Sequence, residues 1–333
     1  MRITIAYNLR QDDSESTAEL ISSEDIDRLY KAISGLQHTV TVVEVSGKPN
    51  DVIDRLVESG PDLIFNLAEG TIGSSREAFY PGLYEQMGIP FTGGNASLLH
   101  LNLDKHLAKT VLATRGVRVP KGILVTGKDR KLPDDLIYPL MIKPNSEGSS
   151  IGISQDSVVD SPARVRQRID EMLVKYPAGL VVEEFISGRE LSVPLIEGYP
   201  GKVLDIVEHT FDLNKTGGKY NIYDYDLKQG AGEPDSVHVV CPARIGEHEE
   251  KAVLEMARHV FDVMICPDMG RVDIRLHTSG EPFFIELNPL PSLHPDASLM
   301  VAARHRGLEF RDVLRLIIRS AARRYHLPVR PAR

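Results

Sequence analysis

The stretch RVDIRLHTSGEPFFIELNPLPSL, residues 271–293, predicts a β-hairpin in which charged and apolar residues are closely interleaved. Two strand-like runs, Gly270–Leu276 and Glu281–Leu287, lie on either side of the turn signal Thr278-Ser279-Gly280. Side chains alternate between the two faces of a strand, so residues two apart share a face. The hairpin therefore gathers some of its polar side chains on one side, and their chemistry indicates a candidate site.

Three oxygen-bearing side chains share that face. Asp273 lies on the first strand, and Glu286 and Asn288 lie two residues apart on the second. Carboxylate and amide oxygens suit Mg²⁺, with Mn²⁺ as an alternative ion, and phosphate oxygens and water would complete the octahedron. The apolar run at residues 283–285 indicates burial, where carboxylates without a cation or partner are costly. The alternatives are edge carboxylates in water, or a plain salt bridge to Arg271.

A second segment, MIKPNSEGSSIGI at residues 141–153, has the composition of an anion-binding loop. An apolar strand ends in Lys143, and a loop of small residues follows, in which backbone N–H groups can approach an anion closely. Ser149 and Ser150 add hydroxyl donors. This arrangement suits a triphosphate, although the lysine precedes the loop and the segment is therefore not a P-loop. An ordinary turn is the alternative.

A third segment, LVVEEFISGREL at residues 180–191, connects two predicted strands. The first strand ends at Glu183-Glu184, and Phe185-Ile186 leads into the next element. Backbone groups of such a connection can pair with the edge of an adenine ring. Glu190 can accept hydrogen bonds from ribose hydroxyls.

The N-terminal region predicts a parallel open sheet, because strand-like and helix-like stretches alternate there. These stretches are residues 2–7, 23–36, 40–45, 51–59 and 62–67. The polar loop 66–76 follows a strand end, a position where ligands of open α/β sheets bind. Farther along, residues 98–115 predict one helix. The long polar stretch Asn214–Ser236 predicts a lid, a binding loop or disorder.

Composition excludes several classes of protein. At about 150 residues per domain, 333 residues predict two or three domains. The 39 basic and 47 acidic residues give a net charge of −8, which argues against a nucleic-acid partner. Cys241 and Cys266 are the only cysteines, too few for a disulfide scaffold or a cysteine-rich zinc site. The N-terminus lacks the pattern of a signal peptide, and no long apolar run predicts a membrane span.

The order of these features resembles the ATP-grasp superfamily and, within it, the D-alanine–D-alanine ligase family. The densest matches are the segments EGSSIG, GRVDIRL and IELNPLP. The resemblance implies a three-domain α/β architecture, with an N-terminal parallel open-sheet domain at 1–95, a central domain at 96–188 and a C-terminal domain at 189–326. It also implies ATP clamped between two domains, a homodimer and a cytoplasmic location.

The resemblance assigns roles to individual residues. Its implied ATP-binding residues are Lys105, Lys143, Ser149, Ser150, Glu183, Glu184, Phe185, Ile186, Glu190 and Lys228. The implied Mg²⁺ ligands are Asp273, Glu286 and Asn288. Arg271 would stabilise the oxyanion of a tetrahedral intermediate, Ser149 would help place the substrates, and Lys228 would reach the phosphates from the lid.

These assignments imply an ATP- and Mg²⁺-dependent carboxylate–amine ligase that joins small amino-acid-like molecules. Phosphorylation turns a substrate carboxylate into an acylphosphate, the amine attacks it, and ADP and phosphate are released. One alternative is a strict D-alanine–D-alanine ligase of cell-wall synthesis. The other is a non-catalytic nucleotide-binding protein that kept the fold. The substrates, their chirality and the nature of the acceptor do not follow from the sequence.

The segments that would bind amino acids depart from the family pattern. The glutamate expected after the first strand aligns with either Glu15 or Glu19, and the tyrosine expected after the lid lysine is Gln229. The family's Pro-Gly is here Pro291-Ser292, and the following loop to Ser298-Leu299 is one residue longer. Ser292, Ser298 and Leu299 are nevertheless candidate substrate residues.

The loop NLAEGTIGSSREA supplies two further candidate substrate residues, Glu69 and Arg76. A carboxylate there can hold an ammonium group, and a guanidinium can hold a carboxylate through two hydrogen bonds. The alternative is a surface ion pair between the two, worth about 0–1 kcal/mol.

Overall fold

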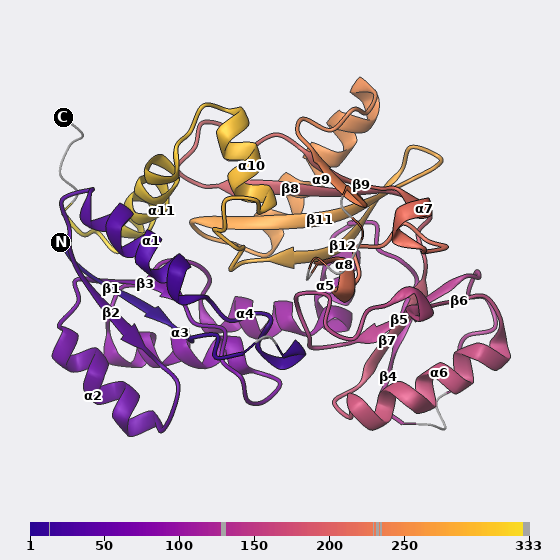
Figure 1. The fold of residues 1–333 in the computed structure, drawn as a ribbon, viewed down its shortest axis with the longest axis horizontal. Coiled ribbons are helices and arrows are strands. Elements are labelled where there is room, and N and C mark those ends of the chain that lie inside the picture. Colours follow the sequence, from indigo (N-terminus) through magenta and orange to yellow (C-terminus); the bar gives the residue numbers. More distant parts are fainter. Residues whose placement is uncertain (13, 128–130, 229, 231–232, 234, 329–333) are drawn as a thin grey trace.

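The computed structural model describes residues 1–12, 14–127, 131–228, 230, 233 and 235–328, in which three β-sheets are flanked by helices (Figure 1). The first sheet is parallel, in the order β2-β1-β3, and consists of β1 (Arg2–Tyr7), β2 (Thr39–Glu44) and β3 (Leu63–Leu67). Its connections contain α1 (Ser23–Ser34) and α2 (Pro49–Ser59). The predicted β-α-β-α-β order is therefore confirmed.

The second sheet is antiparallel, in the order β4-β7-β5-β6. Its strands are β4 (Gly122–Val125), β5 (Leu140–Pro144), β6 (Val158–Val159) and β7 (Leu180–Glu184). The helix α6 (Pro162–Lys175) packs on it, because Val165, Ile169 and Met172 lie on one face and are buried.

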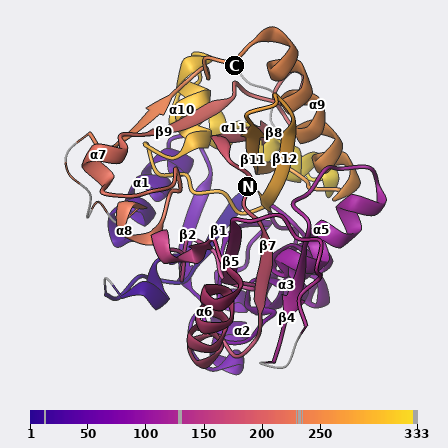
Figure 2. The same ribbon diagram turned by 90° about the vertical axis from the view of Figure 1, so that its right-hand side faces the viewer.

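The third sheet is also antiparallel, in the order β10-β9-β8-β11-β12. Its strands are β8 (Gly188–Ile196), β9 (Val207–Phe211), β10 (Val237–Val240), β11 (Met269–His277) and β12 (Pro282–Asn288). The strands β11 and β12 are the hairpin expected from the sequence. Both views place the second sheet below the third (Figures 1 and 2).

Helices join the sheets through shared hydrophobic cores. One core combines β1, β3 and α1 with α10 (Ser298–His305), α11 (Phe310–Arg324) and part of the third sheet. A second core packs α5 (Lys105–Thr114) and α9 (Glu247–Val263) against β11 and β12. The packing of α5 on β12 brings the first residue of that helix beside the polar face of the hairpin.

The structure corrects three expectations about helices. Residues 98–115 are not one helix, because the chain breaks between α4 (Ala96–Leu103) and α5 at Asp104, whose side chain caps α5 by accepting from the Leu107 N–H at 2.8 Å. The sequence also missed α3 (Arg76–Met87), which is buried around much of its surface and so lacks a clear one-sided pattern. The stretch 214–236 overlaps the short helices α7 (Leu213–Thr216) and α8 (Tyr225–Lys228), while Gln229 lies outside the described residues.

Two short 3₁₀ turns complete the secondary structure of the described residues, η1 (Glu15–Thr17) and η2 (Gln155–Ser157). No helix in the described part of the chain has the length and apolar character needed to cross a membrane.

Candidate functional site

The hairpin brings the three predicted metal ligands together. The strand register pairs Asp273 with Glu286 and Arg271 with Asn288. The Asn288 side-chain amide donates to Asp273 Oδ2 at 2.9 Å and lies 3.5 Å from Glu286 Oε1. From the neighbouring strand β8, the Ser192 hydroxyl donates to Asp273 Oδ1 at 2.7 Å. The three oxygen-bearing side chains form one cluster that fits a hard divalent cation.

Cations surround this cluster. Arg271 makes two hydrogen bonds of 2.7 Å to the Asp273 carboxylate, so the salt bridge considered from the sequence is present. Lys105 Nζ lies 3.4 Å from Glu286 Oε2. Burial by itself would raise the pKa of Glu286, but the positive charges of Lys105, Lys143 and Arg271 hold that pKa at about 2. Glu286 is therefore ionised at neutral pH and able to bind a cation.

Lys143 forms part of a buried charge network that the sequence did not reveal fully. Glu183 Oε1 accepts from Lys143 at 2.9 Å, and its other oxygen accepts from Lys109 on α5. All three side chains are buried. Burial lowers the pKa of Lys109 to about 7, although Glu183 opposes that shift. Lys109 follows Lys105 by four residues on one helix face, which is the signal that could have identified it.

The small-residue loop after β5 approaches the N-terminal region closely. A Cβ atom on Gly148 would lie 2.0 Å from Glu19 Oε1, so a larger residue there would displace the Glu19 carboxylate. Lys105 Nζ donates to the backbone carbonyl of Glu147. The Ser150 hydroxyl donates to the Tyr223 carbonyl at 2.8 Å, which joins this loop to the stretch predicted as a lid. Ser149 has a positive φ of 45°, a strained conformation for a residue with a side chain.

Lys228 ends α8 within that lid stretch. Lys228 is exposed as a residue. Desolvation of its ammonium group and the positive charge of Arg271 lower its pKa, and the negative charges of Glu286 and Asp273 act in the opposite direction. These electrostatic interactions place the lid lysine near the hairpin cluster.

The connection between β7 and β8 has an open backbone donor. The N–H groups of Glu184 and Phe185 donate to the carbonyls of Lys121 and Pro139, at 2.8 and 2.9 Å. Among the residues that the structure describes, none accepts a hydrogen bond from the Ile186 N–H. That group is therefore available to an adenine edge.

Arg275 is a residue of this region that the sequence reasoning missed. Its buried guanidinium donates to the carbonyls of Ile186 at 2.7 Å, Gly188 at 3.2 Å and Asn221 at 2.9 Å. It also donates to Glu190 Oε2 at 3.1 Å and lies 4.9 Å from the centre of the Phe185 ring. One side chain therefore ties the β7–β8 connection to the lid stretch. Its spacing of two residues from Asp273 was an available signal.

The alternative considered for Glu69 and Arg76, a surface ion pair between the two, is not what the structure shows. Arg76 is buried and donates to Glu19 at 2.8 Å, to Glu147 at 3.2 Å and to the Ser146 carbonyl at 2.8 Å. The guanidinium therefore joins the start of α3 to the N-terminal region and the small-residue loop. Of the two glutamates considered from the sequence, Glu19 is therefore the one that contacts Arg76. Glu15 instead accepts from the Gly152 N–H at 2.8 Å.

Two acidic side chains beside Arg76 lack partners. Neither Glu69 nor Glu77 accepts a hydrogen bond within the described ranges of the chain. Burial and then the negative charge of Glu77 raise the pKa of Glu69 well above its usual range. Burial and then Glu19 raise the pKa of Glu77 to about 7. Sequence reasoning missed Glu77, although it directly follows Arg76.

The remaining predicted substrate residues surround the start of α10. Ser298 is its first residue and is buried, and Ser292 is exposed in the preceding loop. Leu299 belongs to the hydrophobic core, so its side chain is not available to a ligand. Any contact it makes with a substrate must come from its backbone.

The pKa of Glu77 leads to a testable pH dependence. A carboxyl group whose pKa is higher in the folded than in the unfolded state favours the fold while it is protonated. For Glu77 this contribution is complete below the pKa of the unfolded chain, and it is lost as the pH rises through the folded-state pKa of about 7. We expect Glu77→Gln to be as stable as the wild type at pH 4 and more stable at pH 8, by about 1–3 kcal/mol. Urea unfolding at both pH values measures this, with the exposed Glu85→Gln on the same helix as control. Equal stability of Glu77→Gln and wild type at pH 8 would contradict it.

Comparisons with known proteins agree with this geometry. The family model described as D-ala D-ala ligase C-terminus matches residues 123–319. The protein y4sG of Sinorhizobium fredii is 31% identical, over 79% of this chain and 75% of its own length. A D-alanine–D-alanine ligase of Citrifermentans bemidjiense is 30% identical, over 82% of this chain and 83% of its own length. The crystal structure of the Bacillus anthracis D-alanine–D-alanine ligase complexed with ATP is 20% identical, with a TM-score of 0.75, 98% coverage of this chain and 99% of that chain. The likeness in fold thus extends beyond the residues matched by the family model.

Proposed function

Since this chain belongs to the D-alanine–D-alanine ligase family, an ATP-grasp family of carboxylate–amine ligases, we propose that it joins two small amino acids or amino-acid-like molecules with ATP and Mg²⁺. The observation that carries the proposal is the meeting of Asp273, Glu286 and Asn288 with Lys105 and Arg271 on the hairpin face. Cations there can hold phosphates, while the carboxylates can hold a divalent ion.

The proposed reaction has two steps. A carboxylate oxygen of the first substrate attacks the γ-phosphorus of ATP, and ADP leaves. The amine nitrogen of the second substrate then attacks the carbonyl carbon of the acylphosphate, phosphate leaves and the amine proton is lost. A Mg²⁺ ion held by Asp273, Glu286 and Asn288 would supply charge neutralisation at the phosphates.

Individual side chains have distinct tasks in this proposal. Lys105, Lys143 and Lys228 bind the phosphate oxygens, and the loop at Ser149-Ser150 surrounds them. Arg271 donates to the oxyanion that forms when the amine attacks. The stretch 214–236 excludes water, which would hydrolyse the acylphosphate.

Adenosine binding falls to the β7–β8 connection in this proposal. Glu183-Glu184 end β7 and Phe185-Ile186 follow in the connection, where the free Ile186 N–H would donate to the adenine edge. Glu190 accepts from the ribose. Burial raises the pKa of Glu190, and the positive charge of the Arg275 guanidinium opposes that shift.

The domain division 1–95, 96–188 and 189–326 is part of the proposal. Each range contains one of the three sheets, which supports the division; the single exception is Gly188, which begins β8 of the third sheet but falls in the second range. We further propose a homodimer, which the family resemblance implies, and a cytoplasmic location, where ATP and free amino acids are available.

A substrate screen tests the proposed function. Purified protein, ATP and Mg²⁺ are incubated with pairs of amino acids of both chiralities, and ADP release is measured together with the product mass. Release with several pairs supports a ligase of broader or different specificity. Release with D-alanine alone, giving the D-alanine dipeptide, supports the strict D-alanine–D-alanine ligase. No ADP with any pair would support the non-catalytic alternative.

The same assay tests the substrate pocket. The candidate residues are Glu69, Arg76, Ser292, Ser298 and Leu299. Glu69→Ala should raise KM for the amino-acid substrate and leave KM for ATP nearly unchanged. Arg76→Ala should do the same, with an additional loss of stability, because it removes a buried guanidinium and leaves the partly buried Glu19 and Glu147 without their partner. Equal changes in both KM values would contradict a role in the amino-acid pocket.

Arg275 should act on ATP binding. We expect Arg275→Met to raise KM for ATP on the order of tenfold, because Ile186 of the β7–β8 connection, Gly188 and Glu190 at the start of β8, and Asn221 of the stretch 214–236 all lose their hydrogen bonds from one charged group. KM for the amino acids should change little. Steady-state kinetics measure the difference, with Arg189→Met on the adjacent strand as control, since Arg189 pairs with Glu208 and is half-exposed. A parallel rise in both KM values would indicate a general loss of structure.

A further inference from the structure

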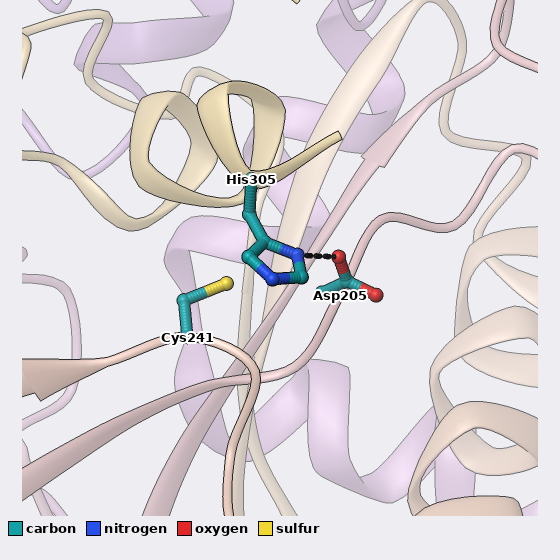
Figure 3. Close-up of side chains that lie close together, drawn as sticks. All are labelled: Asp205, Cys241 and His305. Carbon is teal, nitrogen blue, oxygen red and sulfur yellow. Dashed lines mark hydrogen bonds and ion pairs between the residues drawn. The ribbon is translucent and has the colours of Figure 1, made fainter. Parts of the chain in front are cut away.

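A second cluster of chemically reactive side chains lies outside the proposed ligase site. Asp205 precedes β9, Cys241 follows β10, and His305 is the last residue of α10. One ligand atom from each residue lies within 4.8 Å of the other two. Figure 3 shows the His305 imidazole between the Asp205 carboxylate and the Cys241 thiol. Three segments far apart in the sequence therefore supply sulfur, nitrogen and oxygen donors to one small volume.

Hydrogen bonds already organise this cluster. His305 Nδ1 lies 2.6 Å from Asp205 Oδ2, and the other Asp205 oxygen pairs with the Arg306 guanidinium. A ring held by a carboxylate at Nδ1 presents its other nitrogen as a lone-pair donor. Carboxylate–histidine pairs of this kind orient metal-binding imidazoles in proteins.

We propose that Cys241 and His305 bind one divalent transition-metal ion of the Zn²⁺ class, with Asp205 orienting the imidazole and balancing the charge. Thiolate and imidazole ligands select such borderline-soft ions, whereas Mg²⁺ prefers oxygen. On binding, the ion replaces the thiol proton, which is released, and a sulfur–metal bond forms. Water completes the coordination.

The dimensions of the cluster are compatible with this site. Metal–sulfur and metal–nitrogen distances of about 2.3 and 2.0 Å place tetrahedral ligands about 3.5 Å apart. The ligand atoms, which now lie within 4.8 Å of one another, must therefore approach by no more than about 1.3 Å. The His305 side chain is 45% exposed, which leaves it room to make that adjustment.

The bound ion would connect the C-terminal end of α10 to the start of β9 and the end of the edge strand β10. The same helix begins at Ser298, one of the candidate substrate residues. The ion would therefore fix a helix that also borders the proposed amino-acid pocket. The metal-site inference does not depend on the proposed ligase reaction, since its residues take no part in that chemistry.

Cobalt substitution provides a direct test. Addition of Co²⁺ to the full chain should produce the near-ultraviolet charge-transfer absorption of a thiolate–cobalt bond. The band should be lost in Cys241→Ser and strongly weakened in His305→Gln. It should persist in Cys266→Ala, which removes the buried cysteine, and in Glu286→Ala, because the ligase site offers no sulfur. Loss in Glu286→Ala or persistence in Cys241→Ser would overturn the assignment.

Thiol protection by Zn²⁺ provides a second, independent readout. One equivalent of Zn²⁺ should slow alkylation of Cys241 at least tenfold, as followed by mass spectrometry of the labelled peptide. His305→Gln and Asp205→Asn should reduce that protection, and Cys241→Ser should retain wild-type ligase turnover. Alkylation at the same rate with and without Zn²⁺, together with no cobalt band, would show that the cluster is an ion pair beside an ordinary thiol.

Discussion

Glu286→Ala is expected to lower kcat on the order of a thousandfold or more, while the protein keeps its fold. The carboxylate lies between Asp273, Lys105 and Asn288, and its pKa of about 2 keeps it charged at every pH at which the enzyme would work. Its removal takes away one of the two anionic ligands of the proposed metal site and leaves the surrounding cations less balanced. No core packing is lost, since the side chain is 27% exposed.

The measurement is ADP release at saturating Mg²⁺, accompanied by thermal unfolding. Glu281→Ala is the matched control, because Glu281 precedes the same strand but forms an exposed ion pair with Arg118. Asn288→Asp should be milder than Glu286→Ala, since an oxygen donor remains. A near-normal kcat for Glu286→Ala would remove this residue from the metal site.

Arg271→Met is expected to lower kcat by about 10²–10³-fold, the usual effect of removing one donor to an oxyanion. The Arg271 guanidinium makes two hydrogen bonds to Asp273. Burial by itself would lower the pKa of Arg271, but the negative charges of Asp273 and Glu286 raise it. Arg271 therefore remains a fixed positive charge throughout turnover. Because the interaction with substrate develops only as the amine attacks, KM for ATP should change much less than kcat.

Single-turnover kinetics separate this role from a structural one. Formation of ADP should be slowed less than formation of the peptide-type product, since the oxyanion arises in the second step. Arg118→Met on the exposed ion pair is the control and should behave as wild type. If Arg271→Met slowed both steps equally and lowered stability by the same free energy, the residue would serve only to hold Asp273.

The charge distribution explains why this cluster suits a nucleotide. Glu183 lies between Lys109 and Lys143, and Glu286 lies beside Lys105. Cations therefore outnumber carboxylates along the path from β5 to the hairpin. A triphosphate brings negative charge into that path, where it offsets the repulsion between ammonium groups. The buried Glu183 also prevents the two lysines from repelling each other before ATP arrives.

Much of the fold was accessible from local patterns. The parallel sheet of β1 to β3 and the hairpin of β11 and β12 both follow from periodicity, which depends on neighbours in the sequence. The break at Asp104 and the helix α3 were missed for opposite reasons. A side-chain cap interrupts one helix whose pattern continues through it, whereas burial around α3 removes the one-sided pattern that identifies a helix.

Some residues of the candidate site could likewise be grouped from the sequence, whereas the partners of others could not. Asp273, Glu286 and Asn288 could be grouped from the sequence, because strand alternation and a tight turn determine which residues face each other. The partners of Arg76 could not, since Glu19 and Glu147 are 57 and 71 residues away. Ion pairs at such separations depend on how whole elements pack, and residue spacing carries no information about that.

The sequence by itself determined the family, and with it the class of chemistry, through the order of the segments predicted to bind phosphates and metal. Tertiary structure alone decided which charges are buried and what they contact, including Lys109 against Glu183, the network of Arg275 and the unpartnered Glu77. The physical reason is the range of the interactions. Turns and strand faces are set by adjacent residues, whereas burial and charge pairing arise only when distant segments exclude water together.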